Sequence, residues 1–133
     1  LLYLTAHHWR LAVNRRLKNL GLSQASWVAV ASIARHQQPL SQSELAQELG
    51  VESPTIVPLI HRLVALGLVE RITTASDKRK RLLVVTDKGK ALYEQVKTVA
   101  DDLREEILTA ITPQEQEQTQ RVLEKLLREV EKK

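Results

Sequence analysis

The sequence predicts a mainly helical fold with one small β hairpin, which belongs to the α+β class. Three observations support this prediction. Apolar residues recur at three- and four-residue steps near both ends of the chain, as on one side of an amphipathic helix. Between these ends, two short helical segments joined by a tight turn precede two short apolar strands. The length of 133 residues suits one domain, so we expect a single domain over 1–133.

The composition limits the kind of protein. With 43% hydrophobic and 27% charged residues, the chain should form a globular domain. It contains no cysteine, which excludes disulfides, thiolate metal sites and cysteine redox sensing. The longest apolar run, 27–34, is too short to span a bilayer, and no signal peptide is visible, so we expect a cytoplasmic protein. The chain has no methionine, even at position 1, which suggests that the native N-terminus precedes Leu1.

Two helices are predicted before the centre of the chain. The first runs from about residue 2 to residue 20 and is ended by Gly21. Its apolar side comprises Leu2, Ala6, Trp9, Val13, Leu17 and Leu20. Ser23 caps the second helix, which ends near His36. Its inward residues are Trp27, Val30, Ile33 and Ala34. A short linker follows, to which Leu40 contributes one strand residue.

A helix-turn-helix is predicted next. Ser41 and Glu44 have the spacing of a capping box, and Gly50 ends this helix because the turn favours a positive φ. The second helix begins with Ser53 as N-cap and Pro54 at its first helical position. Its expected buried side comprises Ile56, Ile60, Leu63 and Gly67. Its expected exposed residues are Pro54, Thr55, Pro58, His61, Arg62 and Ala65. In such a unit the second helix enters the major groove of DNA.

A hairpin with a basic tip follows the two helices. Its strands are predicted at 68–72 and 82–85, and the segment between them ends in four adjacent cations at 78–81. Adjacent cations repel one another unless a polyanion neutralises them. Alone, such a run is best explained as a solvated charged loop. Attached to a helix-turn-helix, it indicates a wing that touches DNA, with which the net charge of +4 agrees.

The C-terminal part of the chain predicts two more helices. Thr86 caps the first, which reaches about Ala110. The second begins with a capping box and a proline at its first position, formed by Thr112, Pro113 and Glu115. Its apolar side comprises Val122, Leu123, Leu126, Leu127 and Val130.

The terminal helices have more apolar surface than the winged helix-turn-helix at 22–86 can cover. We therefore expect 1–21 and 87–133 to be dimerisation helices that pack against the same helices of a second copy. A two-fold dimer also matches a pseudo-palindromic DNA site. The alternative is that these helices pack into a bundle within one chain.

These motifs and their order resemble the MarR family of bacterial transcription regulators. The stretch DKRKRLLVVTDKG at 77–89 fits the wing signature of that family, and LVALGLVER at 63–71 matches the turn into the wing. The stretch WRLAVNRRLKNLGLSQASWV at 9–28 is similar to the SlyA branch. The resemblance covers essentially the whole chain. It implies a homodimeric regulator, most simply a repressor, with the helix at 53–66 in the major groove and the wing at the adjacent minor groove.

The resemblance also assigns roles in the wing. It implies that Arg79 inserts into the minor groove, where the negative potential of a narrow A·T tract favours arginine. It implies that Asp77 pairs with a basic residue to hold the wing tip in shape. Lys78, Lys80 and Arg81 would then lie over phosphates, which adds salt dependence to binding without adding specificity.

One position departs from the SlyA-like pattern, because Pro58 stands where an arginine is common. Proline cannot pair with guanine, so we expect a different target sequence and base recognition by neighbouring residues. Apolar contacts from Pro54 and Pro58 to thymine methyl groups are expected as well. The residues that we expect at DNA are Ser41, Ser43, Ser53, Pro54, Thr55, Pro58, His61, Arg62, Arg71, Asp77, Lys78, Arg79, Lys80 and Arg81.

Members of the family often bind phenolic or aromatic carboxylate effectors, which would release the repressor from DNA. Arg10 and Trp27 match residues that line this pocket in SlyA-like proteins, and His7 stands where an arginine is common. The structural alternative places Trp27 in the core and pairs Arg10 with a carboxylate. Two functional alternatives remain as well. The chain could be a constitutive or anti-silencing DNA-binding regulator without a ligand, or a winged helix that holds a protein partner.

The sequence shows no sign of a metal site, a cofactor or catalysis. His7 and His8 are adjacent and therefore point about 100° apart on a helix, and no His-x₃-His pair exists. The carboxylates at 101–106 are best explained as solvated charge on a helix. No nucleophile with a base, and no glycine-rich phosphate loop, is recognisable. We therefore expect a protein that is not an enzyme.

Overall fold

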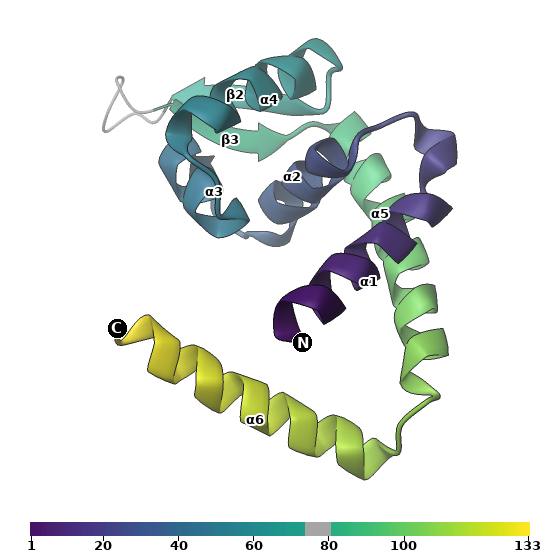
Figure 1. Ribbon diagram of the computed structural model, residues 1–133. Coiled ribbons are helices and arrows are strands. Elements are labelled where there is room, and N and C mark those ends of the chain that lie inside the picture. The colour runs from purple at the N-terminus through teal and green to yellow at the C-terminus, as the bar shows by residue number, and fades with distance from the viewer. Residues whose placement is uncertain (74–80) are drawn as a thin grey trace. The chain divides into compact units, whose positions relative to one another are not determined.

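The computed structural model describes residues 1–73 and 81–133, in which helices predominate and the strands form one small sheet (Figure 1). The described elements are α1 (Leu2–Arg16), the 3-10 turn η1 (Lys18–Leu20), α2 (Gln24–Arg35), β1 (Leu40–Ser41), α3 (Gln42–Leu49), α4 (Ser53–Ala65), β2 (Val69–Thr73), β3 (Arg81–Val85), α5 (Asp87–Leu108) and α6 (Pro113–Glu131). This order confirms the predicted fold class, mainly α with a β hairpin in a winged helix-turn-helix.

The first helix is shorter than predicted. It ends at Arg16, and the amide of Leu17 is shared between the carbonyls of Val13 and Asn14, each at 3.1 Å. Bonds to the third residue back tighten the chain, so η1 replaces the last predicted turn before Gly21. The cap of α2 is confirmed, because the amide of Ser26 donates to Ser23 Oγ at 3.2 Å.

The two helices of the helix-turn-helix are present, with one correction at the start of α4. The capping box of Ser41 and Glu44 is confirmed, and Gly50 ends α3 with φ of 69°. The predicted N-cap at Ser53 is wrong, because Glu52 has the extended backbone of a cap and its carbonyl accepts from the amide of Thr55 at 2.9 Å. Ser53 is therefore the first helical residue, and Pro54 is the second.

The strands form an antiparallel sheet in the order β1–β3–β2, in the part of the chain that the structure describes. Leu40 pairs with Leu83, which confirms the strand residue expected in the linker, and Val69 pairs with Val85. Strands β2 and β3 lie within one residue of their predicted bounds.

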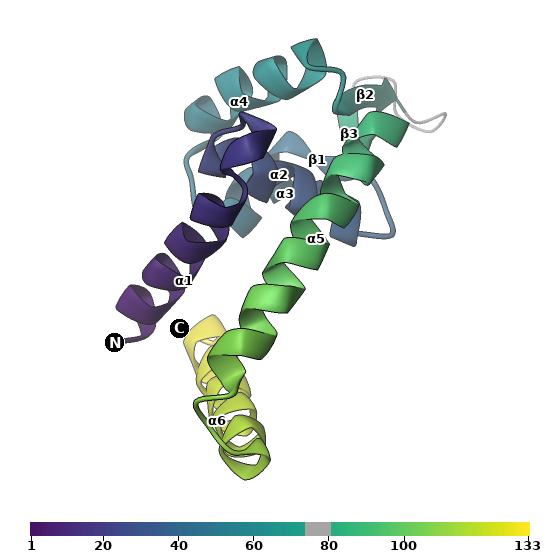
Figure 2. The same ribbon diagram turned by 90° about the vertical axis from the view of Figure 1, so that its right-hand side faces the viewer.

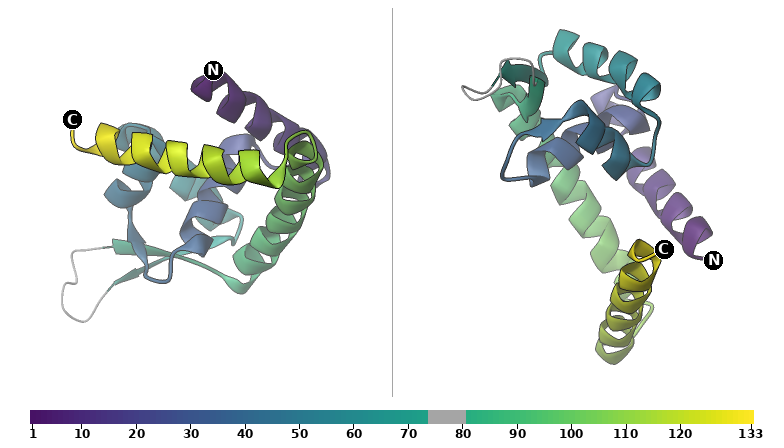
Figure 3. Two further views of the ribbon diagram at one scale, coloured as in Figure 1. Left: turned by 90° about the horizontal axis from the view of Figure 1, so that it is seen from below. Right: turned by 90° about the vertical axis from the view of Figure 1, so that its left-hand side faces the viewer.

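The core lies where α2, α3 and α4 contact one another and the sheet (Figures 2 and 3). Its apolar residues with at most 1% exposure are Ala29, Val30, Leu45, Ile56, Ile60, Leu63, Val69 and Leu83. Burial of each larger side chain stabilises the fold by about 1.5–3 kcal/mol. Three of these residues come from α4, so the core holds that helix by one side. Gly67, which we expected on the same side, is exposed and lies beyond the end of α4.

The chain divides into a larger unit, residues 1–99, and a smaller unit, residues 100–133, with α5 contributing to both. Thr86 caps α5 as predicted, since its Oγ1 accepts from the amide of Gly89 at 3.0 Å. In the smaller unit, the capping box of Thr112 and Glu115 is confirmed at the start of α6. The apolar residues of α6 are exposed, from 41% for Leu123 to 68% for Val130.

None of the helices within 1–73 and 81–133 is long and apolar enough to cross a membrane. The same residues bring together no group of three or more His, Cys, Asp or Glu side chains that could hold a metal ion.

Candidate nucleic-acid interface

Helix α4 presents one continuous exposed side. Ile56, Ile60 and Leu63 are at most 1% exposed, because the 3.6-residue period brings them together on the side that faces the core. The remaining candidate residues of this helix are all exposed, and they are Ser53, Pro54, Thr55, Pro58, His61 and Arg62. The exposed side therefore offers hydroxyl, imidazole and guanidinium groups for hydrogen bonds, together with two proline rings.

Pro58 lies inside α4, and the helix continues on both sides of it. Because proline has no amide hydrogen, the carbonyl of Pro54 lacks the donor that position 58 would normally supply. The exposed side of α4 thus carries a proline ring at a position that supplies no amide donor to the preceding turn.

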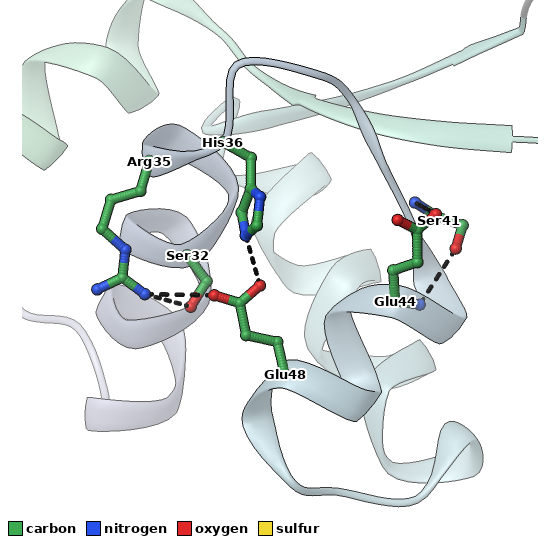
Figure 4. A network of polar contacts seen from close by, with 6 residues as sticks. All are labelled: Ser32, Arg35, His36, Ser41, Glu44 and Glu48. Carbon is green, nitrogen blue, oxygen red and sulfur yellow. Dashed lines mark hydrogen bonds and ion pairs between the residues drawn. The ribbon is translucent and has the colours of Figure 1, made fainter. Parts of the chain in front are cut away.

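A polar network holds α3 against α2 (Figure 4). Glu48 of α3 lies between two residues at the end of α2, with its Oε1 at 3.4 Å from Arg35 Nη2 and its Oε2 at 2.6 Å from His36 Nε2. The same guanidinium donates to Ser32 Oγ at 3.5 Å. These contacts fix α3, the helix that precedes α4. We did not predict them, because their partners are 12 or 13 residues apart and follow no local pattern.

The two candidate serines at the start of α3, the N-cap Ser41 and Ser43, differ in how their side chains are used. Ser41 Oγ accepts from the amide of Glu44 at 3.1 Å, and the amide of Ser41 donates to Glu44 Oε1 at 3.3 Å (Figure 4). The hydroxyl of Ser41 is thus engaged in the capping box. Ser43, two residues on, is exposed.

The two strands of the wing bring a pair of arginines to the same region. Arg71 is half-buried in β2, and Arg81 begins β3, where it pairs with Thr73. Both arginines line a surface pocket of about 490 Å³ that also includes Val64 of α4. Glu70 lines the same pocket, so its described lining holds two guanidinium groups and one carboxylate beside the C-terminal half of α4. Four further candidates, Asp77, Lys78, Arg79 and Lys80, lie outside the described residues.

The three effector candidates do not share one cavity. Arg10 is exposed and lines a cavity of about 250 Å³, whose other lining residues are Gln24, Ala25, Val28, Leu49, Val51, Thr55, Ile56 and Leu59. Trp27 is 7% exposed and is not part of that lining, and its Nε1 donates to Asn14 Oδ1 at 2.8 Å. His7 is exposed and stacks on Tyr3, with ring centroids 5.7 Å apart. Arg10 makes no ion pair within the described residues.

Comparison with known proteins gives a consistent result. The model of the MarR family matches residues 20–80. The transcriptional regulator PA3341 is 39% identical, with a TM-score of 0.92, over 99% of this chain and 96% of that one. Apo wild-type MarR from E. coli is 28% identical, with a TM-score of 0.80, over 95% and 93% of the two chains. MepR from S. aureus, solved in complex with DNA, shares the fold at 22% identity, with a TM-score of 0.81 over 96% and 94%.

Proposed function

Because the chain belongs to the MarR family of transcriptional regulators, we propose that it represses transcription as a homodimer bound to a pseudo-palindromic operator. One observation carries this proposal. The core holds α4 by Ile56, Ile60 and Leu63, and its opposite side is exposed and rich in groups that bind base edges. In a helix-turn-helix, the N-terminal residues of this helix lie nearest the bases.

The proposed DNA contacts divide into two kinds. Residues of α4, above all Thr55, His61 and Arg62, form hydrogen bonds with base edges, and the proline rings contact thymine methyl groups. Arg71 and Arg81, together with the basic segment 78–80, neutralise phosphates or enter the minor groove. Binding should therefore weaken steeply as salt is added.

The homodimer is supported by the apolar side of α6. Five large apolar residues of this helix are exposed in the single chain, and they are Val122, Leu123, Leu126, Leu127 and Val130. An apolar stripe of this size marks an interaction surface. We propose that 1–21 and 87–133 cover it with the same helices of a second copy, and that 22–86 forms the DNA-binding part. The half-sites should then lie about 10 base pairs apart, one turn of DNA.

A ligand-tuned regulator is a second candidate, favoured by the cavity beside Arg10. Thr55, Ile56 and Leu59 of α4 contribute to its lining, so an occupant would contact the recognition helix. A guanidinium beside apolar walls suits a planar aromatic carboxylate or a phenol. Such a ligand would shift the population of DNA-binding conformations. Titration of the DNA complex with 2-hydroxybenzoate separates this candidate from a constitutive binder.

We also propose that the chain belongs to the SlyA-like branch, on the pattern at 9–28, and that it acts in the cytoplasm without enzymatic activity. The departure at Pro58 means that its operator differs from those of SlyA-like proteins that carry arginine there.

Selection from random duplex DNA tests the proposed function. The full chain should enrich an inverted repeat with half-sites about 10 base pairs apart. Arg79→Ala should lose this enrichment, because the proposed minor-groove contact is gone. Arg128→Ala, which removes an exposed arginine from α6, should keep it. Absence of any enriched sequence at low salt would contradict the proposal and favour a winged helix that binds a protein partner.

A further inference from the structure

Three carbonyl groups at and just beyond the C-terminal end of α4, the proposed recognition helix, take donors from outside that helix. Helix α4 is closed by two bonds around Gly67, in which the amide of Gly67 donates to Val64 O and the amide of Leu68 donates to Leu63 O, each at 3.0 Å. This is the Schellman arrangement, and it satisfies carbonyls within the last turn. The carbonyls of Leu66, Gly67 and Leu68 point beyond that turn and must find partners elsewhere.

One short stretch, residues 86–88, supplies all three partners. Lys88 Nζ donates to Leu66 O at 2.9 Å, and Thr86 Oγ1 donates to Gly67 O at 2.6 Å. The amide of Thr86 donates to Leu68 O at 3.1 Å. The ammonium group of Lys88 lies at the negative end of the α4 dipole, where a cation is favoured. The end of the recognition helix is thus bonded to the beginning of α5.

The same stretch also fixes the start of α5. The Thr86 hydroxyl that donates to Gly67 O accepts from the amide of Gly89 at 3.0 Å, so one hydroxyl joins the two helix ends. Gly89 is buried, and a Cβ atom there would overlap the carbonyl oxygen of Leu68. Only glycine allows α5 to begin this close to the end of α4. We call these contacts, between residues 66–68 and residues 86–89, the α4–α5 clamp.

The surface is hollowed beside the clamp. A cavity of about 330 Å³ adjoins it, lined by Leu20, Leu22, Leu66, Leu68, Lys88, Ala91, Leu92 and Gln95. Leu66 itself is 39% exposed. The hydrogen bonds of the clamp therefore lie beside a surface cavity, and they add to the pairing of Val69 with Val85, which joins the same two helices through the sheet.

We propose that Thr86 and Lys88 are positioning residues for DNA recognition. They fix the angle between α4, which recognises the operator, and α5, which belongs to the dimerisation helices. In a two-fold dimer this angle determines the distance between the two recognition helices and therefore the preferred spacing of the half-sites. The inference rests on the proposed function, because spacing has meaning only for a dimer bound to DNA.

The test compares three substitutions in the full chain on the selected operator and on operators with one base pair added or removed between half-sites. Lys88→Met removes the donor, Lys88→Arg keeps charge and donors, and Lys90→Met removes an exposed lysine from the same turn. Lys88→Met should bind the selected operator about fivefold more weakly, in line with the loss of one solvent-exposed hydrogen bond. The same variant should also show a smaller difference in affinity between operators with different half-site spacings. Lys88→Arg should restore both properties, and Lys90→Met should discriminate between spacings as the wild type does.

The dependence of affinity on salt separates positioning from a phosphate contact. Lys88→Met should keep the slope of log affinity against log salt, because the number of phosphate contacts does not change. A slope smaller by about 0.9 with unchanged spacing preference would identify Lys88 as a phosphate contact and overturn the proposal. Equal affinity and spacing preference in Lys88→Met and wild type would overturn it as well. Failure of the wild type to select any sequence would instead overturn the proposed function, and the spacing role with it.

Amide hydrogen exchange without DNA tests the clamp independently of the operator. Exchange at residues 66–68 should be faster in Lys88→Met and in Thr86→Val, which keeps the shape of threonine but loses its hydroxyl. It should stay near the wild-type rate in Lys88→Arg and Thr86→Ser. Thermal unfolding of each variant confirms that the chain still folds. Unchanged exchange in both Lys88→Met and Thr86→Val would show that the bonds do not hold the end of α4.

Discussion

At the scale of single residues, the proposed recognition of bases by α4 depends on Pro58. It lies in the exposed side of the helix and offers a ring without a donor. Pro58→Arg should introduce a bidentate contact with guanine, which discriminates by about 1–3 kcal/mol against other bases. The enriched operator should therefore change at one position of each half-site, as measured by selection from random duplex DNA.

Pro58→Ala is the matched control for this prediction. Alanine restores the amide that donates to Pro54 O but adds no guanidinium, so it reports the effect of the backbone alone. A new guanine should appear in the operator of the arginine variant and be absent from that of the alanine variant. The same operator for Pro58→Arg and wild type would contradict the role assigned to this position.

At the residue scale, the sequence predicted burial correctly where burial follows from the helical period. It did not predict contacts between residues that are distant in sequence. The exposed side of α4 could be read from spacing alone. Trp27, by contrast, looked equally suited to a ligand pocket and to the core. Its burial and its bond to Asn14 depend on how α1 meets α2, which no local pattern reveals.

At the scale of elements, the capping signals located most helix starts, because a serine or threonine cap acts on an amide three residues away. Ser23, Ser41 and Thr112 all cap as predicted. The start of α4 was misplaced by one residue, because its cap is set by the backbone of Glu52 and no side chain accepts a bond there.

The network at Glu48 gives a prediction at this scale. Glu48→Gln removes the charge that Arg35 and His36 share and should lower the free energy of unfolding by up to about 1 kcal/mol, the upper end of the range for exposed ion pairs. The side chains are 31%, 58% and 41% exposed for Glu48, Arg35 and His36, so solvent screens the pairs. Urea unfolding of the full chain measures the change.

Glu105→Gln serves as the control for this experiment. Glu105 is an exposed carboxylate of α5 for which the described residues provide no ion pair, so its substitution should leave the free energy of unfolding within about 0.5 kcal/mol of wild type. Equal losses in the two variants would mean that the contacts of Glu48 add nothing to the stability of the helix-turn-helix.

At the scale of the whole molecule, the sequence predicted more apolar surface on the terminal helices than one chain can cover. In the single chain, the apolar side chains of α6 are indeed exposed. Leu126 and Leu127 are 46% and 59% exposed. If a second copy covers them, each loses about 1.5–3 kcal/mol of transfer free energy when replaced by a polar residue. The double variant Leu126→Ser, Leu127→Ser should therefore weaken dimerisation by about 100-fold or more, as measured by sedimentation over a range of concentrations.

The change in dimerisation caused by the double variant distinguishes a dimer that buries the apolar side of α6 from a monomer in which that side stays exposed to solvent. Solvent-exposed leucines contribute little to folding, so without a partner the double variant would keep the mass and stability of the wild type. Gln118→Ser, on the same helix and also exposed, changes no apolar surface and should dimerise as the wild type does.

The proposed operator recognition needs two recognition helices held one DNA turn apart. The double variant should therefore also lose the preference for an inverted repeat, while each chain keeps weak, salt-dependent binding to DNA. A double variant that remains dimeric and selective would show that α6 does not form the interface and that the other terminal helices suffice.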